Sequence, residues 1–116
     1  MWTLEMRDLL HMKRGSAELA VLAVLEREAL HGYEIAKRIE ARSGGELRFD
    51  VASLYPLLYR LEARELVKGN WEESSSGRKR RRYSLTRAGR KALAPLRKKW
   101  RTFLHALDLV AGVRGA

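Results

Sequence analysis

The stretch LVKGNWEESSSGRKRRRYSLT, residues 66–86, decides the fold. Its two ends, 66–72 and 79–85, are predicted strands, and the polar segment between them, which contains Gly77, is a flexible loop. The run Arg78-Lys79-Arg80-Arg81-Arg82 therefore lies at the tip and rim of a β-hairpin and not in a disordered tail. Positive charges gathered on a small hairpin repel one another, so a polyanion is the natural partner.

The composition indicates a single, strongly basic domain. The chain has 116 residues and a formal net charge of +10, from 24 Lys and Arg against 14 Asp and Glu. Residues 78–101 hold twelve of the basic side chains and no acidic one. Charge placed this unevenly favours nucleic acid, an anionic membrane surface or an acidic protein as the partner. The alternative, a protein that merely happens to be basic, explains the uneven placement less well.

Other features of the sequence narrow the class of function. The chain has no cysteine, so disulfides, thiolate chemistry and thiolate zinc sites are excluded. His11, His31 and His105 lack the spacing of metal ligands, and no phosphate-binding glycine loop or nucleophile–base pattern occurs. We therefore expect no metal, no cofactor and no enzyme activity. The longest apolar run, residues 19–25, is far shorter than a membrane span of roughly twenty residues. We expect a cytoplasmic, nucleoid-associated protein with no membrane partner.

Three helices are predicted before the hairpin, at about 4–28, 33–41 and 51–64. The first is apolar nearly all round in its second half, which predicts a central, buried helix. Gly15-Ser16 interrupts the pattern and is expected to kink this helix or to split off a short N-terminal arm.

The third helix has a distinctive exposed face. Asp50 and Ser53 are both candidate N-caps, and Pro56 favours the later start, because proline near the first turn loses no hydrogen bond. Its apolar stripe consists of Leu54, Leu57, Leu58 and Leu61. Hydroxyl-bearing and basic side chains are left for solvent or a ligand: Ser53, Tyr55, Tyr59, Arg60 and Arg64.

The order helix, helix, helix, hairpin, helix predicts a mainly α protein with a small antiparallel hairpin. This is a winged helix-turn-helix followed by a C-terminal dimerisation helix. A helix of about 10–12 Å diameter fills the major groove, and a basic hairpin beside it can reach the sugar-phosphate backbone. The predicted DNA contacts are Lys37, Arg38, Ser53, Tyr55, Tyr59, Arg60, Arg78, Lys79 and Arg80. The alternatives are half-buried core positions for the two tyrosines and a solvated helix face for Lys37 and Arg38.

The hairpin cannot direct all five basic side chains to one phosphate path. Alternate side chains of a strand point to opposite faces, so DNA contact is assigned to the three side chains nearest the tip. Arg82 is expected to pair with Glu72 or Glu73 across the hairpin, an exposed pair contributing roughly 0–1 kcal/mol. Trp71 is expected to pack at the hairpin base.

The last helix, about 87–111, carries a heptad seam. Apolar residues spaced 3, 4, 3, 4 and 3 form it: Leu93, Leu96, Trp100, Phe103, Leu107 and Val110. We expect this seam to form a homodimer contact, with the N-terminal arm and Trp2 joining it. The alternative is packing against helix 4–28 of the same chain. The expected division is a winged helix-turn-helix with its arm at 1–86 and a dimerisation helix at 87–116, together one compact unit.

Several blocks of the chain occur together in a known pattern. They are Gly15-Ser16, His31-Gly32-Tyr33-Glu34-Ile35, Ser53-Leu54-Tyr55-Pro56-Leu57-Leu58-Tyr59-Arg60-Leu61-Glu62, Leu85-Thr86 with Ala88-Gly89, and Trp100. In this combination the chain resembles the PadR family of bacterial transcriptional regulators, over about residues 14–105. The resemblance implies a homodimeric winged-helix repressor of the short branch. Its third helix and its wing, which is the β-hairpin within residues 66–86, would bind a palindromic operator. It also implies a small hydrophobic or aromatic effector, with Trp100 lining an apolar pocket at the dimer interface; plain dimer packing is the alternative for Trp100.

Two positions depart from the family pattern. Glu65 stands where the family usually has glycine between the third helix and the first strand, so this turn is expected to be strained. Ala52 replaces a glycine just before the Ser-Leu-Tyr-Pro block, which is a mild change. Two other functions stay open: a basic RNA-binding or ribosome-associated winged-helix module, and a protein-interaction or membrane-surface module that uses the last helix. A two-fold dimer separates the first hypothesis from these, because it requires half-sites about 34 Å apart.

Overall fold

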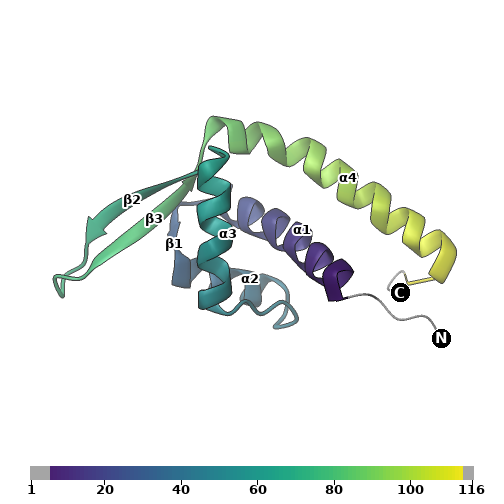
Figure 1. Ribbon diagram of the computed structural model, residues 1–116, viewed down its shortest axis with the longest axis horizontal. Coiled ribbons are helices and arrows are strands. Elements are labelled where there is room, and N and C mark those ends of the chain that lie inside the picture. The colour runs from purple at the N-terminus through teal and green to yellow at the C-terminus, as the bar shows by residue number, and fades with distance from the viewer. Residues whose placement is uncertain (1–5, 114–116) are drawn as a thin grey trace.

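The computed structural model describes residues 6–113, with side chains from residue 15 onward. In chain order the elements are α1 (Met6–Leu25), β1 (Leu30–His31), α2 (Gly32–Arg42), α3 (Val51–Ala63), β2 (Val67–Glu73), β3 (Lys79–Leu85) and α4 (Arg87–Ala111). The β2–β3 hairpin and the far end of α4 project from opposite ends of a molecule 53 Å long (Figure 1). The predicted mainly α fold with a small antiparallel hairpin is confirmed. Trp2, which was expected at the dimer contact, lies outside the described residues.

Helix α1 runs without a break through Gly15 and ends at Leu25. A Cβ atom on Gly15 would lie 3.3 Å from Cζ2 of Trp100 in α4, which is tighter than ordinary van der Waals contact. The glycine therefore allows α4 to approach α1. The predicted split at Gly15-Ser16 is wrong, because the helix continues through the glycine, which serves packing.

The sheet has a third strand that the sequence did not indicate. Strand β1 pairs antiparallel with β3, with Leu30 opposite Tyr83 and His31 opposite Arg82. Strand β3 thus lies in the middle of the order β1-β3-β2. A strand of two residues is too short to show the alternation by which strands are recognised in a sequence. Its effect is to join the hairpin to the start of α2.

Helix α3 begins at the earlier of the two predicted caps. The Asp50 carboxylate accepts a hydrogen bond from the backbone N–H of Ala52, at 3.3 Å. The preference for a start at Ser53 was wrong. Pro56 lies inside the helix, where it cannot donate to the carbonyl of Ala52. Both residues are exposed, so water can satisfy that carbonyl.

The hydrophobic core lies between α1, α2, α3 and the sheet. Its largest fully buried side chains include Leu22, Ile35, Leu58, Leu61 and Tyr83. All four leucines of the predicted stripe on α3 are buried, which confirms the 3.6-residue pattern there. The other faces of α3 are consequently turned outward.

Helix α4 begins in this core and then leaves it. Leu93 is only 1% exposed and Leu96 packs against the same core, so the first part of the seam is covered by the protein's own chain. The assignment of Leu93 to the dimer interface is therefore wrong, because the core of its own chain already covers it. Heptad spacing shows that these apolar side chains share one face of the helix, but it does not show whether that face packs against the same chain or against a second copy.

The turn between α3 and β2 is built on a strained residue. Glu65 has φ of 60°, in the left-handed region that side chains disfavour, as expected for a position where the family has glycine. The N–H of Glu65 donates to the carbonyl of Glu62, and the N–H of Leu66 donates to that of Leu61, each at 2.9 Å. These two bonds form a Schellman cap on α3.

The start of α4 is fastened to this same turn. The Thr86 hydroxyl donates to the carbonyl of Glu65 at 2.7 Å and accepts from the N–H of Gly89 at 2.9 Å. A Cβ atom on Gly89 would lie 2.1 Å from the carbonyl oxygen of Leu66, an impossible contact. The Leu-Thr-x-Ala-Gly block thus brings the helix against the backbone of the turn and fixes the direction in which α4 leaves the hairpin.

Glu65→Gly should stabilise the protein by about 1 kcal/mol, because glycine adopts positive φ without the steric penalty of a Cβ atom. Urea denaturation at neutral pH measures the change. Glu65→Ala is the matched control, since it removes the carboxylate and keeps the Cβ atom. If the alanine variant gains as much as the glycine variant, backbone strain is not the cause.

Candidate nucleic-acid interface

The five basic residues of the hairpin divide into two groups. Arg81 and Arg82 are held by carboxylates of the same chain. Arg78, Lys79 and Arg80 are exposed, and none of them forms an ion pair within residues 15–113. The charge available to a partner therefore lies at the tip of the wing, where β2 and β3 turn.

Arg81 fastens the wing to α3. Its guanidinium donates to both carboxylate oxygens of Glu62, at 2.9 and 2.6 Å, and to the carbonyl of Gly69 at 2.8 Å. The bond to Glu62 is the main reason why the pKa of Arg81 is raised. The same group lies 5.4 Å from the ring centres of both Trp71 and Tyr83. A bidentate pair of this kind fixes orientation as well as distance.

Gly69 leaves room for this clamp. A Cβ atom at Gly69 would lie 2.7 Å from the guanidinium carbon of Arg81. A larger residue at this position would displace the arginine from Glu62. The Glu62–Arg81 pair was not predicted from the sequence; its one signal was the acidic residue at the end of the Ser53–Glu62 block.

Arg82 and His31 connect the wing to the start of α2. Arg82 donates to both oxygens of Glu72, at 3.1 Å, which confirms the expected pairing across the hairpin, and also to the carbonyl of Ala29. The buried His31 places Nε2 at 2.5 Å from Glu72 and Nδ1 at 2.7 Å from Glu34. Three elements thus meet at one histidine.

The carboxylates at this junction are held ionised. Hydrogen bonds from Arg82 and then from His31 lower the pKa of Glu72. The backbone N–H of His31, which donates to Glu34 at 2.9 Å, is the main reason why the pKa of Glu34 is lowered. This bond also completes a capping box at the N-terminus of α2.

Glu72 should make the stability of the protein depend on pH in acid. A lowered folded-state pKa means that its stabilising contribution is complete above the usual value of about 4.5 and is lost as the pH falls through the lowered value. Glu72→Gln should therefore flatten the decline of the thermal midpoint between about pH 6 and pH 3. Glu73→Gln is the control. Equal declines in the wild type and in Glu72→Gln would contradict this assignment.

The outward side of α3 has three strips. At about 3.6 residues per turn, its centre is formed by Ala52, Pro56 and Tyr59, all exposed. Ser53 and Arg60 lie along one flank, beside the loop that precedes the helix, and are exposed there. Tyr55 lies on the other flank, beside the wing, with its ring 6.2 Å from that of Tyr59. The predicted contacts on α3 therefore share one outward side.

Tyr55 is half-buried, because its ring packs against α2. A Cβ atom on Gly32 would lie 3.0 Å from the Tyr55 ring. This contact explains why a glycine precedes Tyr33 at the start of α2. Tyr55 is therefore half-buried, which was the alternative to DNA contact for both tyrosines. Tyr59, at 52% exposed, stays available to a partner.

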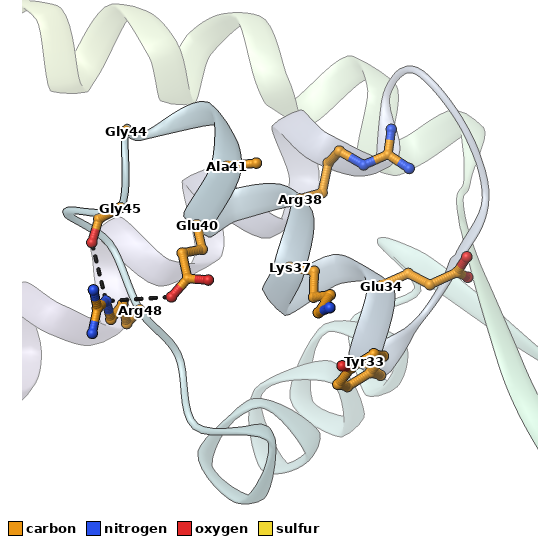
Figure 2. Close-up of a pocket in the computed structure, with 9 residues that line it drawn as sticks. All are labelled: Tyr33, Glu34, Lys37, Arg38, Glu40, Ala41, Gly44, Gly45 and Arg48. Atoms are coloured by element: carbon orange, nitrogen blue, oxygen red, sulfur yellow. Dashed lines mark hydrogen bonds and ion pairs between the residues drawn. The ribbon is translucent and has the colours of Figure 1, made fainter.

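The two basic residues predicted on α2 point in different directions. Figure 2 shows Lys37 beside Tyr33 and Arg38 turned away from both. The Lys37 ammonium lies 5.1 Å from the centre of the Tyr33 ring, and Arg38 forms an ion pair with Glu28. Of the two, Lys37 has the freer charge. The hollow in this view is open and of mixed charge, with Arg48 bonded to Glu40 and to the carbonyl of Gly45.

The expectation that Trp71 packs at the hairpin base is wrong. It is 66% exposed on the sheet face that turns toward α3, in the hollow that Tyr55 and Tyr59 also line. The Trp71 ring is contacted by the Arg81 guanidinium and not by core residues. Trp71 shares its face of β2 with the buried Val67, so alternation alone places it inward; it is exposed because this part of the hairpin extends beyond the core.

The second half of α4 presents an apolar face with no cover within the described residues. Trp100 and Phe103 contact each other edge to face, with ring centres 5.7 Å apart. Phe103 is exposed, and so are Leu107 and Val110 further along the helix. Nearer its start, α4 is tied to the turn that follows α1 by Arg97, which donates to both oxygens of Glu26, at 3.2 and 2.8 Å. Apolar residues gathered in this way are typical of a protein interface.

A model of the "Transcriptional regulator PadR-like family" matches residues 21–95. The chain belongs to the PadR family. Members of this family are transcriptional regulators and not enzymes, so the chain is a PadR-family transcriptional regulator. The matched residues include α2, α3 and the whole wing, which are the elements that carry the interface described above.

Two relatives resemble this PadR protein over most of their own length. It is 30% identical over 96 residues to an uncharacterised protein, protein X, of Lysinibacillus sphaericus, covering 83% of this chain and 88% of that protein. A PadR family transcription regulator from Clostridium difficile superposes with a TM-score of 0.68 at 28% identity, over 81% of this chain and 96% of that one.

A third relative is a DNA complex. Bacillus subtilis PadR bound to operator DNA superposes with a TM-score of 0.62 at 22% identity, over 67% of this chain and 44% of that one. At this identity the likeness shows the fold.

Two absences complete the description of the site. Within the described part of the chain, no three side chains are placed to hold a metal ion. No helix in the same part is long and apolar enough to cross a membrane.

Proposed function

We propose that this PadR protein is a homodimeric repressor that binds a palindromic operator with α3 in the major groove and the wing on the flanking backbone. The observation that carries the proposal is the division of the basic run. Arg81 and Arg82 form ion pairs that hold the wing in place. The three basic residues at its tip have no acidic partner among the described residues: Arg78, Lys79 and Arg80. Free cations on a rigidly held hairpin beside an exposed helix suit a phosphate backbone.

Sequence reading is assigned to α3. Ser53, Tyr59 and Arg60 reach the outward side of that helix, and an arginine contact to a guanine contributes roughly 1–3 kcal/mol of discrimination. Tyr55, Lys37 and Arg38 are assigned to the margin of the contact. The Bacillus subtilis relative, whose crystal structure contains operator DNA, supports duplex DNA as the partner. This role would place the protein in the cytoplasm, at the nucleoid.

The test is binding to the DNA upstream of the protein's own gene, measured across a salt series with unrelated duplex and RNA as competitors. We expect the upstream DNA to bind roughly 10³-fold more tightly than unrelated duplex. Equal affinity for unrelated RNA would contradict the proposal and favour the alternative of an RNA-binding or ribosome-associated module.

The dimer is assigned to the second half of α4. Trp100, Phe103, Leu107 and Val110 lie on one side of this helix and stay uncovered or half-covered in the single chain. Two copies of this side could cover each other about a two-fold axis. Leu96 lies at the boundary between this face and the protein's own core. Residues 1–86 and 87–116 then form one unit, since the start of α4 belongs to the core.

Leu107→Glu should shift the protein from dimer to monomer, because it places a charge in the apolar contact. Light scattering coupled to size exclusion measures the mass. Leu109→Glu is the matched control: Leu109 is equally apolar and 73% exposed, and it lies on the opposite side of α4 from Leu107. A monomeric wild type, or equal loss of dimer in both variants, would contradict this interface.

The effector is assigned to Trp100 at the dimer contact, where the Trp100 and Phe103 rings, nearly perpendicular to each other, form an apolar corner against which a flat ring could pack. A small hydrophobic or aromatic compound bound there could move the wing, because Thr86 joins the wing to α4. Flat aromatic compounds should quench the tryptophan fluorescence of the wild type and not of Trp100→Ala. No quenching across a broad panel would leave Trp100 as plain packing.

A further inference from the structure

A second feature of the DNA-facing side is not explained by duplex binding. A hollow of about 320 Å³ lies between the start of α2, the Tyr55 flank of α3 and the wing. Four aromatic side chains line it: Tyr33, Tyr55, Tyr59 and Trp71. Tyr33, Tyr59 and Trp71 are 58%, 52% and 66% exposed. Three large rings left in water beside one another indicate a binding surface.

The charge around the hollow favours an anion. Lys79 and Arg80 lie at its edge and have no ion pair within residues 15–113. The acidic residue that lines it, Glu34, is engaged by the side chain and the backbone N–H of His31. Arg81 is neutralised by Glu62. The excess charge presented to a ligand is therefore positive and comes from the wing tip.

Flat rings beside free cations suit a base with its phosphate. In a duplex the faces of the bases are covered by their neighbours, and a protein meets only base edges and backbone. The ring faces of Trp71 and Tyr59 therefore have nothing to stack on. In a single strand both base faces and phosphates are accessible, and aromatic side chains beside a basic track are the means by which single strands are bound.

We propose that this hollow binds single-stranded DNA, with an unpaired base stacked on Trp71 and Tyr59 and the adjoining phosphate at Lys79 and Arg80. A volume of about 320 Å³ suits one planar ring system, being at the small end of ligand pockets. The activity goes beyond operator binding and needs neither a dimer nor a palindrome. Because the same wing cations serve the duplex, single strand and duplex compete for the site.

The experiment is fluorescence anisotropy of a short labelled oligothymidylate, which has little structure of its own, titrated with the full chain at low and moderate salt. Trp71→Leu and Tyr59→Leu should each weaken its binding roughly tenfold or more, the loss expected for one stacked base. Trp71→Phe and Tyr59→Phe keep a ring face and should retain most of the affinity. Because both side chains are exposed, circular dichroism should show all four variants folded.

A duplex of equal length is measured with the same proteins. Its binding should be unchanged by Trp71→Leu, because Trp71 is not among the residues assigned to duplex contact. Tyr59→Leu is left out of this comparison, because Tyr59 also lies on the side of α3 assigned to the duplex. Three results would overturn the inference: no binding of oligothymidylate by the wild type, equal losses for single strand and duplex in Trp71→Leu, or phenylalanine variants as weak as leucine variants. Failure of the proposed function would instead appear in the duplex arm, as the absence of preference for the upstream DNA.

Discussion

Replacing Arg78, Lys79 and Arg80 together with alanine should weaken duplex binding by roughly a hundredfold, taking about 1 kcal/mol for each of three charge-assisted contacts. The loss should be the same for every DNA sequence, because phosphate contacts carry no sequence information. The slope of log affinity against log salt should fall by about one for each lost phosphate contact. Titrations of operator and unrelated duplex over a salt series measure both quantities.

The matched control removes as much charge elsewhere. Lys98, Lys99 and Arg101 are exposed on α4, away from the wing, and their triple alanine variant has the same net charge as the wing variant. It should keep most of the wild-type affinity. If both variants lose affinity alike, the protein attracts DNA by its overall charge and the wing has no special place. If the wing variant changes sequence preference, the wing reads bases.

Glu62→Ala should destabilise the fold by about 2–3 kcal/mol, because it leaves the partly buried Arg81 without its carboxylate. The side chains of Arg81 and Glu62 are 19% and 29% exposed, so water replaces the lost bonds only in part. The Nε atom of Arg81 is already buried without a partner among the described residues. Urea denaturation should show the loss, and operator binding should weaken, because the wing is no longer fixed to α3.

Two comparisons make the effect of Glu62 specific. Glu73→Ala removes an exposed carboxylate from the end of β2 and should leave stability nearly unchanged. The double variant Glu62→Leu with Arg81→Met should recover much of the loss, since replacing both partners of such a pair by apolar groups leaves no charge unpaired. A wild-type unfolding midpoint for Glu62→Ala would show that the clamp does not hold the wing.

The elements that could be predicted from the sequence are those with a repeated local pattern. The inner side of α3 could be predicted because its four leucines recur at the helical period: Leu54, Leu57, Leu58 and Leu61. The remaining residues of the helix were then assigned to its outward side. The hairpin was recognisable because strands with a polar loop between them are a local feature. The fold class rested on the order of these elements.

The features that could not be predicted depend on contacts between distant residues. Glu62 and Arg81 are 19 positions apart and meet only once the wing folds onto α3. Gly15 resembles a helix break in the sequence, but its partner, Trp100, is a residue of α4. Leu93 has the same heptad spacing as Leu107, although one is buried within the chain and the other is not. A local pattern states that a residue is apolar and does not state what covers it.

Hydroxyl-radical footprinting on the DNA upstream of the gene tests the central claim most directly. A dimer with α3 in the major groove and the wing on the backbone should protect two symmetric patches whose centres lie about 34 Å apart, one helical turn. The outer edge of each patch should become accessible again when Arg78, Lys79 and Arg80 are replaced by alanine. A single patch, or uniform weak protection along the fragment, would contradict the account.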